Sequence, residues 1–154
     1  MTKKVSKNTT GAARLPRGIR NNNPLNIRRS TSHWMGKVEN PTDREFEQFA
    51  EMFFGIRAGM LLLTHYVVDY KLRTLKGIVH RWAPDGDGGN NERAYREALM
   101  QRGVTSDVKL TKEWLFGLMA AMCEVESQYA LTRKTFEEAF AICTMAKQTW
   151  RAGV

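Results

Sequence analysis

One segment near the N-terminus leaves the chain little choice of conformation: Arg17-Gly18-Ile19-Arg20-Asn21-Asn22-Asn23-Pro24-Leu25-Asn26-Ile27-Arg28. Three asparagines that run into a proline cannot continue a helix or a central strand, because proline fixes its own φ and restricts the residue before it. Asparagine side chains bond to nearby backbone and tolerate left-handed dihedral angles, so we predict a shaped, amide-rich turn. Such a turn either lines a site for a polar, neutral ligand such as a sugar or is an ordinary loop rich in Asx turns.

The length of 154 residues suits one domain with a sizeable hydrophobic core. Residues 1–16 are small, polar and basic, so we predict a flexible N-terminal arm ahead of a single domain over residues 17–154. The longest apolar run, Met60-Leu61-Leu62-Leu63, is far too short to span a membrane. The basic N-terminus has no apolar stretch of the kind that a secretory signal needs, so we expect synthesis in a bacterial cytoplasm without a signal peptide.

The charge balance is strongly basic, with 24 Lys and Arg residues against 16 Asp and Glu residues and a formal net charge of +8. This excess predicts attraction to polyanions, namely nucleic acid, anionic lipid or an acidic cell-wall polymer. Much of it lies in the first thirty residues, which form either a solubilising tail or a docking arm. Cys123 and Cys143 have no metal-ligand spacing and are interpreted as reduced core thiols. We expect neither a metal nor another cofactor.

The spacing of apolar residues predicts a mainly helical domain from Met52 onward. Three- and four-residue steps over residues 53–70 predict a long, core-facing helix, and a shorter helix is predicted over residues 75–82. Gly55 and Gly59 lie inside the long helix, where glycine is costly, so we expect close packing against a neighbour there. Three further helices are predicted from their capping residues, namely Asn91, Thr111 and Thr135.

The segment before these helices has a different pattern. Residues 26–49 mix turn formers with spaced aromatic residues, which favours short strands in a small β-hairpin over a helix. The predicted fold class is therefore α+β, mainly helical, with a small β-hairpin.

A candidate catalytic group lies at the end of the helix that follows Thr111. The apolar residues of that helix form one continuous stripe, namely Trp114, Leu115, Leu118, Met119 and Met122. Steps of about 100° per residue put Glu126 on the same stripe and Glu124 on the opposite side. Burial and the negative end of the helix dipole both disfavour a charged carboxylate, so we predict a raised pKa for Glu126, as a glycosidase acid needs. The alternatives are exposure of Glu126 at a fraying helix end and an ion pair with Arg133.

A series of shorter motifs follows residues 17–28, namely Trp34-Met35-Gly36, Phe46-Glu47-Gln48-Phe49, Gly55-Ile56-Arg57-Ala58 and Trp82-Ala83-Pro84. Together they resemble a family of phage and prophage proteins that are often labelled virion structural proteins and look lysozyme-like. In that family a tyrosine-bearing helix and a helix that ends in a glutamate come next, and Tyr95 and Glu126 occupy those places. The chain departs from the family pattern in its glycine-rich loop after Pro84 and in Ser127-Gln128.

Two further motifs are similar to those of peptidoglycan-cleaving enzymes. Val125-Glu126-Ser127 resembles the end of the catalytic helix of soluble lytic transglycosylases, and Asn23-Pro24-Leu25-Asn26-Ile27 resembles the substrate-groove turn of bacterial glucosaminidases. In those enzymes the glutamate helix precedes the groove segment, whereas here it follows. The resemblances therefore imply a lysozyme-like domain whose elements are in circularly permuted order.

The resemblances also imply roles for individual residues. Glu126 would protonate the glycosidic oxygen between amino sugars of peptidoglycan, with amides binding acetamido and hydroxyl groups and aromatic rings bordering the sugars. The substrate-binding residues would be Asn23, Asn26, Trp34, Gln48, Tyr66 and Tyr95. Trp82 could join them, but its place at the end of an apolar stripe favours the core. A hydrolase can use a second carboxylate, whereas a lytic transglycosylase can work with one. The candidates for that carboxylate are Asp43, Glu45 and Glu47.

The leading hypothesis is a peptidoglycan-cleaving glycosidase of phage or mobile-element origin, either a lytic transglycosylase or a muramidase or glucosaminidase. Without a signal peptide, it would reach the cell wall through a virion, a pore or a secretion machine. The second hypothesis is a non-catalytic virion structural or nucleic-acid-associated protein on a lysozyme-like scaffold, with the basic arm on nucleic acid. A third is a wall-binding module without catalysis.

Overall fold

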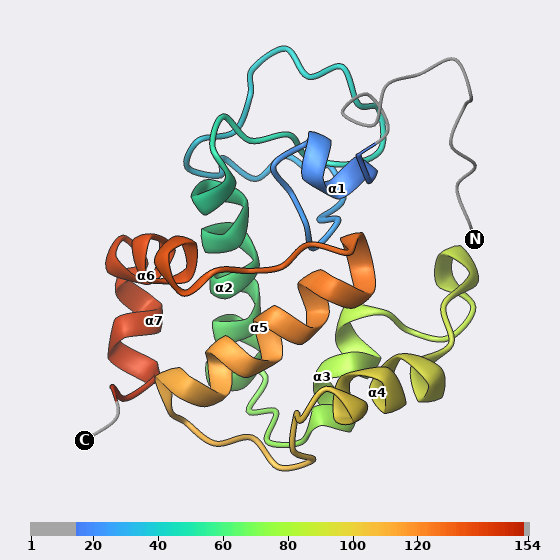
Figure 1. The fold of residues 1–154 in the computed structure, drawn as a ribbon, viewed down its shortest axis with the longest axis vertical. Coiled ribbons are helices and arrows are strands. Elements are labelled where there is room, and N and C mark those ends of the chain that lie inside the picture. Colours follow the sequence, from blue (N-terminus) through green and yellow to red (C-terminus); the bar gives the residue numbers. More distant parts are fainter. Residues whose placement is uncertain (1–14, 153–154) are drawn as a thin grey trace.

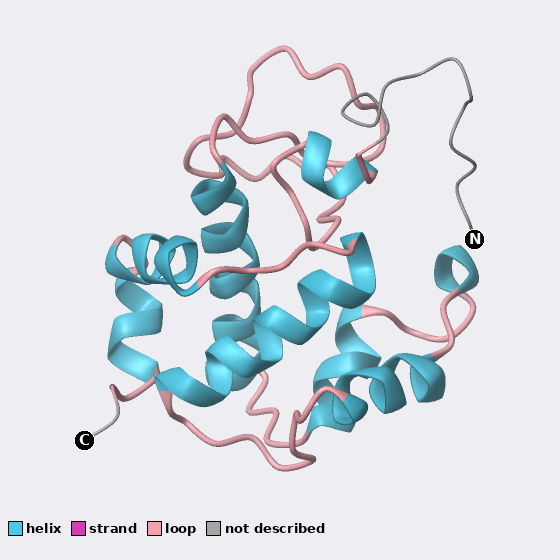
Figure 2. Ribbon diagram, viewed as in Figure 1, coloured by secondary structure: helices cyan, strands magenta, loops and turns pink. Residues whose placement is uncertain are grey.

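Helices make up most of the computed structural model, which describes residues 15–152 (Figure 1 and Figure 2). The α-helices of this part of the chain are α1 (Arg17–Arg20), α2 (Met52–Val68), α3 (Leu75–Trp82), α4 (Glu92–Gln101), α5 (Lys112–Ser127), α6 (Arg133–Ala141) and α7 (Thr144–Thr149). One short 3₁₀ helix, η2 (Asp87–Gly89), lies in the glycine-rich loop. The predicted mainly helical class is confirmed. Of the arm expected over residues 1–16, residues 1–14 lie outside the described part.

The predicted long helix and the short one after it correspond to α2 and α3. Asn91 and Thr111 cap α4 and α5 as predicted, each accepting a hydrogen bond from a backbone N–H in the first turn. The single helix expected from a cap at Thr135 to about Trp150 is wrong in two respects. Thr132 provides the cap, and the helix divides into α6 and α7. The single helical turn α1 is an addition to the predicted helices.

The β-hairpin expected over residues 26–49 is not formed, and residues 15–152 contain no strand. Two isolated bridges, Arg28 with Phe46 and Lys37 with Phe49, join the two sides of this segment instead. Gly36 adopts a φ of 79° in a turn, and Pro41 has no N–H to donate to a ladder. These residues interrupt each extended run, so scattered backbone hydrogen bonds, such as those from Arg29 N–H to Glu45 and from Glu47 N–H to Ile27, stand in place of a continuous ladder.

The amide-rich turn of residues 21–27 packs directly on the glycines of α2. A Cβ atom at Gly55 would lie 1.9 Å from the carbonyl oxygen of Asn22, and one at Gly59 would lie 2.2 Å from Cδ1 of Leu25. The predicted close packing at both glycines is thus confirmed, and their neighbour is the turn itself. Asn22 and Asn26 both have a φ of 53°, the left-handed conformation that asparagine tolerates.

The hydrophobic core is formed by α2, α5 and α6 with contributions from the other helices. The apolar stripe of α5 is buried as predicted, with Leu115, Leu118 and Met119 at 0% exposure. Both cysteines are free and buried, which agrees with their prediction as core thiols. In Figure 1 the C-terminal end of α5 points to the gap between the turn after α1 and the pair α3 and α4. This arrangement determines what surrounds Glu126.

Candidate functional site

Glu126 lies in the last turn of α5 and binds three side chains from three other parts of the chain. The Tyr95 hydroxyl in α4 donates a hydrogen bond of 2.8 Å to Oε2 of Glu126. The indole N–H of Trp82, at the end of α3, donates to the same oxygen at 3.2 Å. Asn26 Nδ2 lies 3.4 Å from Oε1 and 3.3 Å from the backbone oxygen of Glu126. The carboxyl group is therefore held in one orientation.

Burial raises the pKa of Glu126 above its ordinary value, while the hydrogen bonds from Tyr95, Trp82 and Asn26 act in the opposite direction. Burial has the larger effect, as expected for a carboxylic acid at the end of an apolar stripe. Burial, followed by the neighbouring carboxylate, also raises the pKa of Tyr95, so that its hydroxyl keeps the proton that it donates.

Of the two alternative environments considered for Glu126, the ion pair with Arg133 does not form, and the Glu126 side chain is only partly exposed at a helix end that is closed rather than frayed. Arg133 forms ion pairs with Glu113 and Glu137 instead. The end of α5 is closed by a left-handed Gln128, whose N–H bonds to backbone oxygens of the last turn. By contrast, Glu124 on the opposite side of α5 is exposed and pairs with Arg102, as the helical spacing predicts.

A cavity of about 430 Å³ opens in front of the Glu126 carboxyl. Its wall on the side of the amide-rich turn comes from residues 25–28 and Phe46. The opposite wall comes from Tyr66 in α2, residues 81–84 at the end of α3, and the loop that contains Asp87 and Gly88. The cavity is thus lined by a carboxyl group, by amide and guanidinium groups and by aromatic rings. Pockets of this composition suit polar ligands with apolar faces.

Three of the predicted site residues line this cavity, namely Asn26, Tyr66 and Glu126, and a fourth, Tyr95, donates its hydrogen bond to the Glu126 carboxyl. Asn23 does not, because it is completely buried inside the turn. Its amide nitrogen donates to the backbone oxygens of Ile27 and Glu47, and its amide oxygen accepts from the Ile27 N–H. All of its hydrogen bonds are used to shape the turn, so the expected contact with substrate is not available.

Gln48 and Trp34 also lie away from the Glu126 cavity. The Gln48 side chain bonds to Asn21 and to the backbone of Thr42 and therefore fixes the loop from within. Trp34 borders a different hollow beside His33 and Lys37. Both residues follow the turn in sequence, but without a hairpin the loop carries them to another part of the surface.

Two residues of this site are not among those predicted from the sequence. The apolar stripe favours a core position for Trp82, but Trp82 donates a hydrogen bond to Glu126 and lines the cavity. The signal was its position before Ala83-Pro84, because a helix usually ends before a proline and exposes the side chains of its last turn. The second is Asp87 in the glycine-rich loop, for which the sequence offers no specific signal. It is the one other carboxylate among the described residues that line the cavity.

The three carboxylates suggested as partners of Glu126 instead form ion pairs that stabilise the loop of residues 26–49. Asp43 forms a two-pronged ion pair with Arg17 and accepts from Asn21, contacts that lower its pKa. Glu45 bridges Arg17 and Arg28. Glu47 is fully buried and pairs with Lys37 at 3.1 Å. None of the three lines the cavity in front of Glu126.

Within residues 15–152, no group of three or more His, Cys, Asp and Glu side chains could hold a metal ion. None of the helices in the same range has the length and apolar character needed to cross a membrane.

Comparison with known proteins gives one informative match. No protein-family profile matches the sequence. Protein P5 of Pseudoalteromonas phage PM2 is 35% identical to this chain over 132 residues, and the alignment covers 80% of the chain and 82% of the phage protein. Identity of this extent over most of both proteins shows common descent. The chain belongs to the family of this phage protein P5.

Proposed function

We propose that this protein is a glycosidase that cleaves peptidoglycan, with Glu126 as the general acid. One observation carries the proposal: the largely enclosed Glu126 carboxyl lines a polar and aromatic cavity, next to the amide-rich turn. A carboxylic acid whose pKa is raised by burial keeps its proton near neutral pH and can donate it to a leaving group.

In the proposed reaction, Glu126 donates its proton to the oxygen that links two amino sugars. The bond from that oxygen to the anomeric carbon breaks, and water or a hydroxyl group of the same sugar attacks the carbon. The attacking hydroxyl group loses a proton, which restores the acid form of Glu126. Tyr95 and Trp82 hold the carboxyl in place, while Asn26 and Tyr66 border the sugars. A lysozyme-like scaffold in permuted order accounts for a catalytic helix that follows the groove turn in sequence.

The context of a phage family supports this proposal, because a phage has to cross the bacterial wall. Delivery by a virion, a pore or a secretion machine would bring the protein to its substrate. The positive charge of the chain suits an acidic wall polymer.

The test compares purified sacculi treated with the wild type, with Glu126→Gln and with Glu124→Gln. Glu126→Gln removes the proton donor, so we expect release of soluble fragments to fall by roughly 100-fold or more. Glu124→Gln is the matched control, because it makes the same change on the exposed side of the same helix. Equal activity of the wild type and Glu126→Gln would overturn the proposal. A wild type that binds sacculi without releasing fragments would favour a wall-binding or virion structural protein.

Product analysis distinguishes the two forms of the reaction. Attack by water creates a new reducing end. Attack by the sugar's own hydroxyl group creates an anhydro sugar, which has no reducing end. Asp87 lines the same cavity as Glu126, and a hydrolase would use it to activate water, so Asp87→Asn should slow a hydrolase and leave a transglycosylase almost unchanged.

A further inference from the structure

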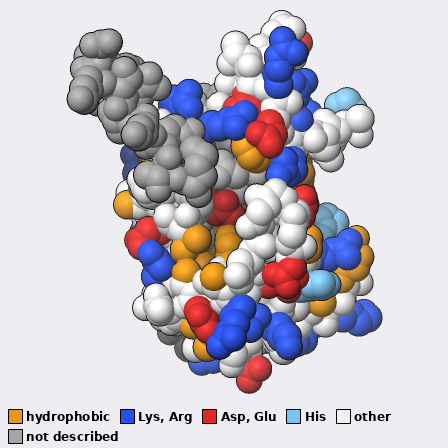
Figure 3. Space-filling view, turned by 90° about the vertical axis from the view of Figure 1, so that its right-hand side faces the viewer, with side chains coloured by type: hydrophobic (Ala, Val, Ile, Leu, Met, Phe, Trp, Pro, Cys, Tyr) orange, Lys and Arg blue, Asp and Glu red, His pale blue; other side chains and the backbone are white. Residues whose placement is uncertain are grey.

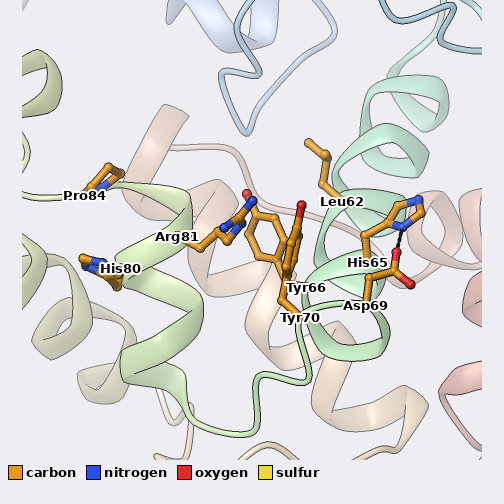
Figure 4. A pocket seen from close by; sticks show the side chains of 8 residues that line it. All are labelled: Leu62, His65, Tyr66, Asp69, Tyr70, His80, Arg81 and Pro84. Carbon is orange, nitrogen blue, oxygen red and sulfur yellow. Dashed lines mark hydrogen bonds and ion pairs between the residues drawn. The ribbon is translucent and has the colours of Figure 1, made fainter.

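A second cavity, of about 590 Å³, adjoins the first. Figure 4 shows the side chains that line it. The two cavities share four lining residues, namely Leu62, Tyr66, Arg81 and Pro84. A ligand that fills the cavity in front of Glu126 can therefore continue into the second one. Of the residues that line this second cavity, only Tyr66 has a role in the proposed reaction.

Aromatic rings form a row from the Glu126 cavity into the second one. The ring centroids of Trp82 and Tyr66 are 6.3 Å apart, and those of Tyr66 and Tyr70 are also 6.3 Å apart. Tyr70 is half exposed, at 50%. Rings that keep one face open to solvent offer apolar surface to the flat side of a sugar and a hydroxyl group for hydrogen bonding.

Arg81 supplies an uncommitted positive charge to this row. Its guanidinium carbon lies 3.6 Å from the Tyr70 ring centroid and 5.9 Å from that of Tyr66. Figure 4 shows the Arg81 side chain reaching from α3 toward the two rings, while His80 lies on the other side of α3. Stacking on a ring orients the guanidinium but uses none of its N–H donors.

The histidine and aspartate side chains that line the second cavity already have partners. His65 pairs with Asp69, and His80 pairs with Glu92. No described carboxylate forms an ion pair with Arg81 within residues 15–152. An oriented guanidinium with free donors matches the planar, two-oxygen geometry of a carboxylate.

We propose that the second cavity binds a carboxylate carried by the glycan strand, with Arg81 as its ligand and Tyr66 and Tyr70 against the sugar that bears it. The inference rests on the proposed function, since it takes the strand to be peptidoglycan. Two carboxylates of that polymer share the required chemistry: the lactyl group of an amino sugar without its peptide, and the acidic residues of an attached peptide.

Binding to the Glu126→Gln protein tests the inference, because this variant is expected not to consume its ligands. Calorimetric titration would use three soluble ligands: a neutral chitooligosaccharide, a peptidoglycan glycan stripped of peptide, and the same glycan with peptides attached. Arg81→Gln is then added to the Glu126→Gln background. The matched control is Arg44→Gln, because Arg44 is exposed and lines none of the cavities described here.

We expect Arg81→Gln to weaken binding of an acidic glycan about tenfold more than binding of the chitooligosaccharide, since a charge-assisted pair is lost. Arg81→Lys should restore part of the difference, because it keeps the charge without the planar fork. Selective loss for the stripped glycan identifies the lactyl carboxylate, and selective loss for the peptide-bearing glycan identifies the peptide. Arg44→Gln should affect all three ligands equally.

Equal weakening for neutral and acidic ligands, or no binding of any of them, would overturn the inference. Its failure is distinguishable from failure of the proposed function. Sacculi cleaved equally well by the wild type and by Glu126→Gln would disprove the catalytic role while leaving charge-selective binding to be measured. Conversely, the inference alone would be disproved if cleavage of sacculi requires Glu126 but Arg81→Gln weakens binding of acidic and neutral ligands equally.

Discussion

Glu124 and Glu126 are two residues apart in α5, yet their environments differ completely. Glu124 is exposed and pairs with Arg102, whereas Glu126 is largely enclosed by side chains from α3, α4 and the amide-rich turn. An offset of about 200° around the helix axis separates them. Enclosing a carboxyl group without a cationic partner costs stability, and such a cost is typical of residues retained for chemistry.

This cost predicts how stability depends on pH. The pKa of Glu126 is raised in the folded protein, so the folded state holds this proton more tightly than the unfolded chain. The wild type therefore loses stability as the pH rises through the unfolded-state pKa toward the raised one, whereas the neutral amide of the Glu126→Gln variant has no proton to lose. We expect thermal melts of Glu126→Gln and the wild type to agree at about pH 3.5 and to diverge in favour of Glu126→Gln by about pH 8. A constant difference across this range would contradict the prediction, and Glu124→Gln provides the control.

At the level of elements, the decisive contact is that between α2 and the turn of residues 21–27. Gly55 and Gly59 are one helical turn apart, so both face the turn and let its backbone approach. Gly18 in α1 plays a similar part, because a Cβ atom there would lie 2.0 Å from Oγ of Ser127 at the end of α5. These small residues bring Asn26 to the carboxyl of Glu126.

Gly55→Ala should therefore displace the turn. The added methyl group would lie 1.9 Å from the carbonyl oxygen of Asn22, so we expect a loss of about 1–3 kcal/mol or more in the free energy of unfolding. Gly117→Ala in α5 is the control, since no atom lies within 4 Å of its added Cβ. That change should stabilise the helix by roughly 0.5–1 kcal/mol. Urea denaturation measures both, and similar values for the two variants would refute the contact.

For the whole molecule, the relevant property is the net charge of +8. Figure 3 shows lysine and arginine side chains on both the upper and the lower part of the face that it presents, with acidic side chains among them. Many of the acidic groups are paired, including Asp43, Glu113 and Glu137 with neighbouring cations. The uncompensated charge is positive and favours attraction to anionic polymers.

Binding of the Glu126→Gln protein to intact sacculi should consequently weaken with salt. The Debye length falls from about 30 Å at 0.01 M to about 8 Å at 0.15 M ionic strength, which screens long-range attraction. We expect several-fold less protein to cosediment with sacculi at the higher salt, while binding of a neutral chitooligosaccharide should change little. Cosedimentation that is independent of salt would show that charge does not direct the protein to the wall.

The parts of the fold that could be predicted from sequence are those governed by local rules. The helix period, the caps at Asn91 and Thr111, and the inward direction of Glu126 all depend on residues within a few positions of one another. The prediction of a hairpin was wrong because the spacing of aromatic residues indicates strands but not their pairing. Pairing into a ladder depends on residues distant in sequence, and Gly36 and Pro41 interrupt it. Trp82 packs against the core, as the apolar stripe favours, but the stripe does not reveal that its last member also borders the cavity.

The sequence by itself determined helices α2 to α5, the amide-rich turn and an acidic side chain on the apolar side of α5. Only the tertiary structure decided that Asn26 rather than Asn23 meets Glu126, that Trp82 and Tyr95 join it, and that Trp34 and Gln48 lie elsewhere. The physical reason is that periodicity gives each side chain a direction around its own helix. Which groups meet depends on how closely the elements approach. The glycines of α2, the packing of α4 against α5 and that of α3 against α4 determine this.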